Sequence, residues 1–129
     1  MSSFTRQIVT TSKAPGPWPA LSQAVIHNGV VYCSGSLGTD PETKTFVPGT
    51  IKDRTTQALK NLENVLIAAG SGSDRILKMT VYVTSMDDVP LLNEAYSAFF
   101  SDPKPARACV CVAALARGTD VEIDCIAAL

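Results

Sequence analysis

The chain has 129 residues, a formal net charge of −1 and a hydrophobic share of 46%. This length is typical of one domain with its own core, so we expect residues 1–129 to form a single domain. The 11 Lys and Arg residues are scattered along the chain, which argues against nucleic-acid binding because proteins of that class present a basic surface. No apolar run is long enough to span a bilayer, so no membrane partner is expected.

The N-terminal segment has no apolar central region and therefore does not resemble a secretory signal. Residues 1–13 are rich in Ser and Thr, lack acids and carry Arg6 and Lys13, a composition that leaves a mitochondrial transit segment open. Residues 4–10 fit a first strand equally well. We favour the strand and expect a cytoplasmic protein.

Four cysteines raise the question of disulfides or a metal site. Nothing indicates secretion, so disulfides are not expected. A zinc site is not expected either, because the sequence has no Cys-x-x-Cys and only one histidine. We predict small buried thiols in a reducing compartment. The cysteines are Cys33, Cys109, Cys111 and Cys125.

The N-terminal half is predicted to contain a hairpin and a helix. Residues 14–20 form a Pro-rich loop, since proline lacks an amide donor. Strands at 23–27 and 30–34 flank Asn28-Gly29, a strong hairpin signal. The helix begins with a capping-box pattern and ends before a glycine stop signal. The cap is Thr50 with Asp53, the apolar positions are Ile51, Thr55, Ala58, Leu59, Leu62, Val65, Leu66 and Ala69, and the stop is Gly70.

The C-terminal half is predicted to contain a strand at 76–84, a helix at 87–100 and strands at 107–115 and 121–127. In the first strand, the alternating residues Leu77, Met79, Val81 and Val83 form the expected apolar face. The strand at 107–115 is apolar at both parities and should be covered on both faces. Two helices can cover one face of a mixed sheet, so we expect a second copy of the chain on the other. The pattern predicts an α+β fold and an oligomer.

Several polar residues stand where packing alone would not place them. Arg107 opens an apolar strand, and its planar fork of donors matches a carboxylate. Glu122 interrupts the last strand, where a carboxylate can orient or deprotonate a water. Asn93 on the second helix and the Ser34-Gly35 pair also stand out. From the residues alone, a purely structural alternative is an ion pair of Arg107 with Glu122 or with the neighbouring acid Asp124.

Longer motifs resemble the RidA (YjgF-like) family over residues 14–127. The resemblance implies a chorismate-mutase-like α+β fold, with two helices on one face of a mixed sheet, and a homotrimer with clefts between subunits. The motifs are Asn28-Gly-Val-Val-Tyr-Cys-Ser-Gly35, Asn93-Glu-Ala-Tyr96, Pro105-Ala-Arg-Ala-Cys-Val-Cys-Val-Ala113 and Gly118-Thr-Asp-Val-Glu-Ile-Asp-Cys-Ile-Ala127.

The resemblance also implies an enzyme, a 2-iminobutanoate/2-iminopropanoate deaminase that hydrolyses a C=N bond without metal or organic cofactor. By position, Arg107 would bind the substrate carboxylate and Glu122 would position the attacking water. The pocket would be lined by Ser34, Gly35, Asn93 and Cys109, the last in part through its backbone.

This sequence departs from the family in one loop. Members commonly have Gly-Pro-Tyr-Ser-Gln-Ala, whereas here Gly16-Pro17 is followed by Trp18-Pro-Ala-Leu21. The pocket tyrosine is missing, and either Trp18 or Leu21 fills its place, which leaves substrate preference open. One alternative is a non-catalytic trimer that binds a small ligand. Retention of both Arg107 and Glu122 favours the enzyme, since a sensor needs no carboxylate to position water. RNA cleavage, a third reading, has little support from the scattered cations.

Overall fold

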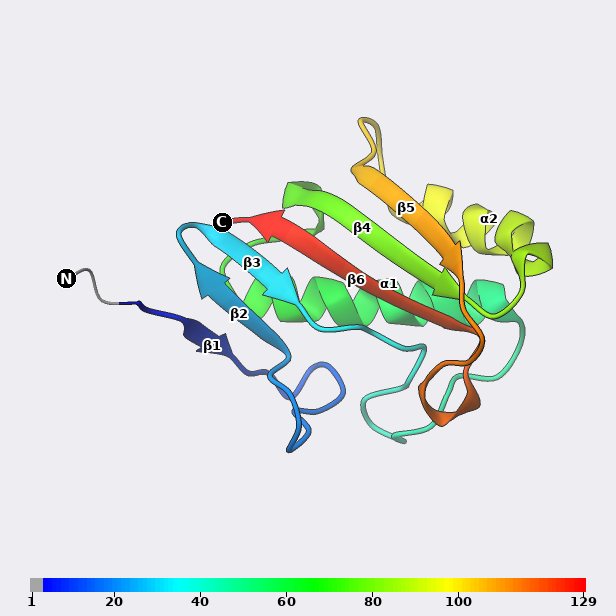
Figure 1. Cartoon of the computed structure of the whole chain (residues 1–129), viewed down its shortest axis with the longest axis horizontal. Helices are drawn as coiled ribbons and strands as arrows, with labels where there is room; N and C mark the ends of the chain where they lie inside the picture. The colour runs from blue at the N-terminus through cyan, green and yellow to red at the C-terminus, as the bar shows by residue number, and fades with distance from the viewer. Residues whose placement is uncertain (1–3) are drawn as a thin grey trace.

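The computed structural model describes residues 4–129, which fold as a six-stranded mixed sheet with two helices on one face (Figure 1). This confirms the predicted α+β class and the order of elements. The elements are β1 (Gln7–Val9), β2 (Ala24–His27), β3 (Val30–Cys33), α1 (Ile51–Ala68), β4 (Ile76–Val83), α2 (Val89–Phe99), β5 (Ala106–Cys111) and β6 (Val121–Ala128).

The strands lie in the order β1-β2-β3-β6-β4-β5. All neighbours are antiparallel except β4 and β5, and α2 provides the crossover that a parallel pair needs. The last strand of the chain therefore lies in the middle of the sheet, between β3 and β4. Within residues 4–129, no helix has both the length and the hydropathy that a bilayer crossing requires.

Local signals explain α1. The Thr50 hydroxyl accepts a hydrogen bond from the amide of Lys52, and Asp53 accepts one from the amide of Thr50 at 2.9 Å, so the predicted capping box is present. The helix ends at Ala68, and Gly70 follows with φ of +86°, a conformation that favours glycine. The predicted apolar stripe faces the sheet, and its buried members include Leu59, Leu62 and Leu66.

Two details differ from the predictions. Leu77 is 52% exposed, because a register irregularity between Ile76 and Lys78 removes it from the buried face that Met79 continues. Strand β5 ends at Cys111 instead of residue 115, and beyond it residues 113 and 114 are exposed. Cys111 is itself exposed, so the prediction of a buried thiol is wrong there.

The other cysteines fit the prediction better. Cys125 is buried, and Cys33 and Cys109 are half-buried. All four thiols are free. A hydrogen bond with Cys33, together with burial, raises the pKa of the Cys125 thiol well above its ordinary value. A thiol in that state is a poor nucleophile, so Cys125 acts as part of the core.

The face of the sheet opposite the helices is uncovered in the single chain (Figure 1). Strand register places Val25, Tyr32, Ile126 and Val110 on this face, and Tyr32 and Val110 are 44% and 42% exposed. The same register also places polar and charged side chains of β4 and β6 on this face, so it is mixed. Exposed apolar side chains gathered in this way often mark a contact with another layer. The expectation that a second copy covers it remains a prediction.

Candidate active site

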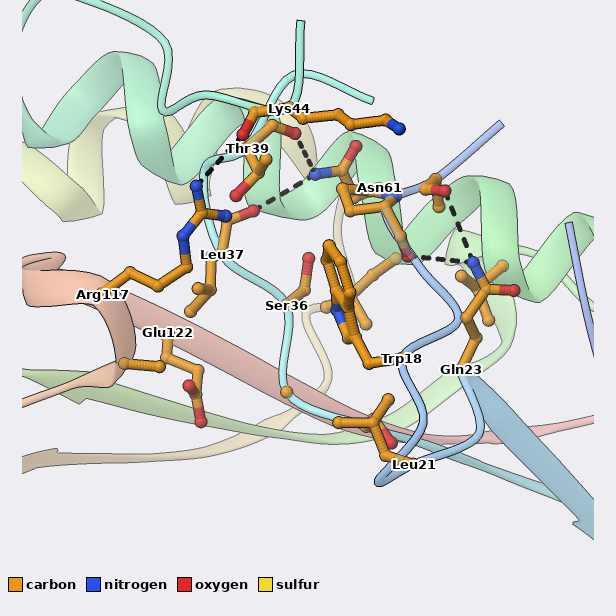
Figure 2. Close-up of a pocket in the computed structure, with 17 residues that line it drawn as sticks. Trp18, Leu21, Gln23, Ser36, Leu37, Thr39, Lys44, Asn61, Arg117 and Glu122 are labelled. Carbon is orange, nitrogen blue, oxygen red and sulfur yellow. Dashed lines mark hydrogen bonds between the residues drawn. The ribbon is translucent and has the colours of Figure 1, made fainter. Parts of the chain in front are cut away.

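A cavity of about 580 Å³ lies where β3 and β6 separate (Figure 2). The two strands pair as far as Tyr32 and Ile126. The next pairing, between Ser36 and Ile123, is out of register by one residue and is held by hydrogen bonds of 2.7 and 2.9 Å. An extra residue on one strand bends the chain and redirects side chains, a device often found beside active sites.

Glu122 and Gly35 meet in this bend. A Cβ atom on Gly35 would lie only 2.6 Å from Oε2 of Glu122, so the glycine makes room for the carboxylate. Burial raises the pKa of Glu122, and the negative charge of Asp124 raises it further. Among residues 4–129, no cation forms an ion pair with Glu122. A carboxylate with a raised pKa is suited to take a proton from water near neutral pH.

Ser34 lies beside Gly35 on the cavity wall. Its hydroxyl donates a hydrogen bond of 2.6 Å to the carbonyl of Ser22, and its amide donates to the carbonyl of Gln23 at 3.0 Å. The hydroxyl proton is therefore used, while the oxygen can still accept a hydrogen bond. The structure thus brings together three of the six predicted site residues: Ser34, Gly35 and Glu122.

The remaining three lie elsewhere, at β5 and α2. Arg107 pairs in register with Met79, whose side chain faces the helices, and its guanidinium lies 4.6 Å from the ring centre of Tyr96 on α2. Asn93 is one helical turn before Tyr96 and so shares its side of the helix. Cys109 packs against the core from the same face of the sheet.

This arrangement excludes the purely structural alternative for Arg107. Strand β4 lies between β5 and β6, so Arg107 has neither Glu122 nor Asp124 on a neighbouring strand. Glu122 pairs with Tyr82 and faces away from the helices, opposite to Arg107. Among residues 4–129, Arg107 forms no ion pair. One chain therefore presents two halves of the predicted site, on opposite faces of its sheet.

Sequence reasoning missed Gln23, which shapes the cavity wall. Its side chain is 5% exposed. Its amide nitrogen donates hydrogen bonds to the carbonyls of Thr11 and Pro15 at 3.0 and 2.9 Å, and its oxygen accepts one from the amide of Thr11 at 2.8 Å. The Pro-rich loop has few amide donors of its own, so its carbonyls need such a partner. This need for a side-chain donor was the signal in the sequence that could have indicated a role for a residue such as Gln23.

Asn61 plays a similar part on α1. Its amide donates hydrogen bonds to the carbonyls of Leu37 and Thr39 at 3.2 and 2.8 Å, which holds the segment after β3 over the cavity (Figure 2). Gln57 in turn donates to the Asn61 oxygen at 2.9 Å. Helix α1 thereby positions the irregular wall of the site.

Trp18 and Leu21 form the opposite rim. The amide of Leu21 donates a hydrogen bond of 3.1 Å to the carbonyl of Trp18, closing a turn with Pro19 at its second position. Both side chains line the cavity (Figure 2). Whether either takes the place of the family's tyrosine stays a prediction.

Arg54 and Asp120 connect α1 to the loop before β6. The guanidinium donates two hydrogen bonds to the carboxylate, at 2.8 and 2.7 Å, and both side chains are partly buried. The hydrogen bond from Arg54 lowers the pKa of Asp120. Because Asp120 directly precedes β6, this ion pair fixes where the strand that carries Glu122 begins.

We expect Asp120→Asn to lower the free energy of unfolding by about 1–2 kcal/mol at neutral pH, since a charge-assisted pair is lost at a partly solvated site. A carboxylate whose pKa is lowered by folding stabilises the fold above its unfolded pKa and loses that effect as pH falls through its folded pKa. The difference between wild type and variant should therefore shrink in acid. Urea unfolding at several pH values measures it, and an unchanged difference would contradict the assignment.

Within residues 4–129, no group of three or more His, Cys, Asp or Glu side chains is arranged to hold a metal ion. The site offers instead a carboxylate in a cavity and a separate arginine. Its polar groups suit a small anionic molecule that reacts with water.

Comparison with known proteins places this geometry in a family. A family model described as endoribonuclease L-PSP matches residues 11–129. The rat protein named 2-iminobutanoate/2-iminopropanoate deaminase is 42% identical over 127 residues, which cover 98% of this chain and 93% of that protein.

Two solved structures are similar throughout. RidA from the Antarctic bacterium Psychrobacter is 41% identical with a TM-score of 0.91, covering 95% of this chain and 99% of that chain. TdcF from E. coli, solved with bound serine, is 33% identical with a TM-score of 0.90, covering 95% of this chain and 98% of that one. The chain therefore belongs to the YjgF/RidA family, whose model bears the endoribonuclease L-PSP description.

Proposed function

We propose that the protein is a deaminase that hydrolyses 2-imino acids, such as 2-iminobutanoate and 2-iminopropanoate, to 2-oxo acids and ammonia. The observation that carries this proposal is the division of the site into two incomplete halves. Among residues 4–129, Glu122 forms no ion pair, although Lys44 and Arg117 also line its cavity, and Arg107 lies on the other face of the sheet, again without an ion pair. The half with Arg107 can bind the carboxylate of an imino acid, and the half with Glu122 can activate the water that hydrates its C=N bond.

In this proposal the two halves meet between neighbouring copies in a homotrimer. Ser34, Gly35 and Glu122 come from one copy, and Arg107, Asn93 and Cys109 from the next. The exposed apolar side chains on the sheet face that the helices leave uncovered, among them Tyr32 and Val110, support such an assembly, because exposed apolar patches mark protein interfaces. A cyclic arrangement lets every copy use both halves of its surface.

The chemistry follows from the two charges. Arg107 binds the substrate carboxylate through paired hydrogen bonds and fixes the imine carbon beside Glu122. Glu122 takes a proton from water as the oxygen attacks the imine carbon and the C=N π electrons move to nitrogen. The protonated carboxyl then returns the proton to nitrogen, which gives a carbinolamine with one hydroxyl and one amino group. Glu122 takes the hydroxyl proton and passes it to the amino group as the C–N bond breaks, so that the C=O bond forms and ammonia leaves.

The relatives support the substrate class. The rat relative is named for this activity, and the E. coli relative was solved with an amino acid bound. The endoribonuclease description points elsewhere, but RNA binding needs clustered cations, and this chain has a net charge of −1 with dispersed Lys and Arg. Against a non-catalytic ligand-binding trimer stands the presence of both Arg107 and Glu122, because binding alone needs no carboxylate to position water.

The test is release of 2-oxo acid and ammonia from 2-iminopropanoate and 2-iminobutanoate generated in situ, corrected for spontaneous hydrolysis. We expect the wild type to accelerate release in proportion to enzyme concentration and to have the mass of a trimer in solution. A folded trimer that accelerates neither imine would contradict the deaminase and leave the ligand-binding alternative. A folded monomer that accelerates both would contradict the shared site.

A further inference from the structure

The cavity is much larger than a small imino acid requires. Its volume of about 580 Å³ falls within the range of pockets that enclose drug-sized ligands, about 300–1,000 Å³. A substrate whose side chain is one methyl or ethyl group would contact Glu122 and leave most of this space to water. In the proposed trimer, Arg107, Asn93 and Cys109 of the next copy approach the Glu122 end, and the rest of the space is available to a longer substrate side chain.

The walls beyond Glu122 are mainly apolar. Trp18 and Leu21 form one rim, and Leu37, Leu62 and Val65 line the interior toward α1. Figure 2 shows Glu122 toward one end of the cavity and Trp18 with Leu21 toward the other. Apolar surface removed from water contributes roughly 25 cal/mol per Å², so an apolar side chain placed here adds binding energy.

The backbone of the loop that carries Trp18 is constrained on both sides, while the Trp18 side chain is 47% exposed. Gly16 has φ of +88°, and a Cβ atom on it would lie 3.4 Å from the backbone nitrogen and from Nε1 of Trp18. The Gln23 amide holds the carbonyls on the N-terminal side of this loop, and the Trp18–Leu21 turn closes the other side. A preorganised wall binds a ligand without first having to be ordered.

Two cations also line the cavity, so an acidic side chain needs consideration. The Arg117 guanidinium is already engaged, donating to the Lys44 carbonyl at 3.1 Å and lying 5.1 Å from the ring centre of Phe46. In Figure 2 the Lys44 ammonium lies on the far side of the view from Glu122. The observations favour an apolar occupant.

We propose that the preferred substrates are 2-imino acids with branched or aromatic apolar side chains, of the kind derived from leucine or phenylalanine, and that Trp18 and Leu21 determine this preference. The inference rests on the proposed function, because it assumes that Glu122 marks the reacting end of the cavity. The side chain of the substrate extends from the imine carbon toward α1 and lies against Trp18.

Binding can be measured apart from turnover, because Trp18 is the only tryptophan in the chain. Its fluorescence should respond to 4-methyl-2-oxopentanoate, the product of the leucine-derived imine, at concentrations about tenfold lower than to pyruvate. Each buried methylene contributes up to roughly fourfold, and pyruvate lacks several of them. Equal or tighter binding of pyruvate would overturn the inference.

The second measurement is the kcat/KM for imines generated from alanine, leucine, phenylalanine and glutamate. We expect kcat/KM to be about tenfold higher for the leucine- and phenylalanine-derived imines than for the alanine-derived one. Trp18→Ala should remove about tenfold for the bulky imines and less than about twofold for the small one, and Trp18→Phe should restore most of it. Ile67→Ala, which truncates an exposed side chain on α1, is the matched control. It should leave kcat/KM unchanged for the bulky imines and for the small one.

The outcomes separate the two proposals. Acceleration of the alanine-derived imine alone, or an equal loss on every imine in Trp18→Ala, overturns the apolar preference and leaves the deaminase intact. A preference for the glutamate-derived imine overturns it in favour of Lys44 and Arg117. No acceleration of any imine overturns the proposed function, and the fluorescence titration still decides what the cavity binds.

Discussion

Arg107→Ala is expected to lower kcat/KM by about a hundred- to a thousandfold, the usual effect of removing one preorganised group that fixes a charged substrate. The loss of kcat/KM should be equal for 2-iminobutanoate and 2-iminopropanoate, because both substrates carry the same carboxylate. Lys60→Ala, which removes an exposed cation from α1, is the matched control and should retain full activity. The guanidinium also contacts Tyr96, so thermal unfolding and solution mass must be compared to show that the variant keeps its fold and assembly.

The same variant can reveal how the site is assembled. Glu122→Gln and Arg107→Ala chains, each inactive alone, are mixed during refolding so that they form joint trimers. In a cyclic trimer the Glu122 of one copy meets the Arg107 of the next. About a quarter of the interfaces then join two intact halves, and about a quarter of wild-type activity returns.

A mixture that stays inactive, although mass spectrometry shows both chains in one trimer, would contradict a site shared between copies. Separate trimers of each variant, mixed without refolding, are the control and should remain inactive. Recovery in that control would mean that the chains exchange freely, and the refolding step would then be unnecessary.

Part of this fold could be predicted because its signals are local. The Thr50–Asp53 cap, the helical spacing that follows it and Gly70 all act within a few residues of α1, and the structure confirms each. The hairpin at Asn28-Gly29 is similar, since both residues adopt the positive φ that such a turn requires, 49° and 77°.

The arrangement of the site could not be predicted, because it depends on strand order. Nothing near Glu122 in the sequence indicates that its strand inserts between β3 and β4, which puts β4 between Glu122 and Arg107. Without that order, an ion pair between them remained a reasonable alternative. The contact of Glu122 with Gly35 likewise joins distant segments, through a bend that no periodicity reports.

Gln23 is a second residue whose role could not be predicted from its neighbours in the sequence. Its neighbours in sequence identify a strand, but its function depends on carbonyls that the Pro-rich loop presents from earlier in the chain. The prolines indicate that the carbonyls of the loop need a donor, but they do not indicate which side chain supplies it. The departure at Trp18 was visible in the sequence, whereas its contact with the cavity required the structure.

Glu122→Gln is expected to lower kcat by about a hundred- to ten-thousandfold, the contribution typical of a positioned acid–base group. The variant keeps the size and shape of the side chain and one acceptor oxygen, but the other oxygen becomes an amide donor, and the side chain cannot take a proton. Because burial raises the pKa of Glu122, its charged form destabilises the fold, and stability falls as pH rises through that pKa. The variant should therefore unfold at a temperature no lower than wild type at neutral pH, which separates loss of chemistry from loss of structure.

The pH profile gives this residue a signature of its own. Wild-type kcat/KM, corrected for spontaneous hydrolysis, should fall in acid with an apparent pKa above the ordinary glutamate value, since the base must be ionised to act. Asp124→Asn removes the neighbouring negative charge that raises this pKa, so its acid limb should move to lower pH while activity above the limb persists. Tyr82 donates a hydrogen bond of 3.0 Å to Asp124, and an asparagine oxygen can still accept it. A limb that stays at the same pH in Asp124→Asn would assign the titration to a group other than Glu122.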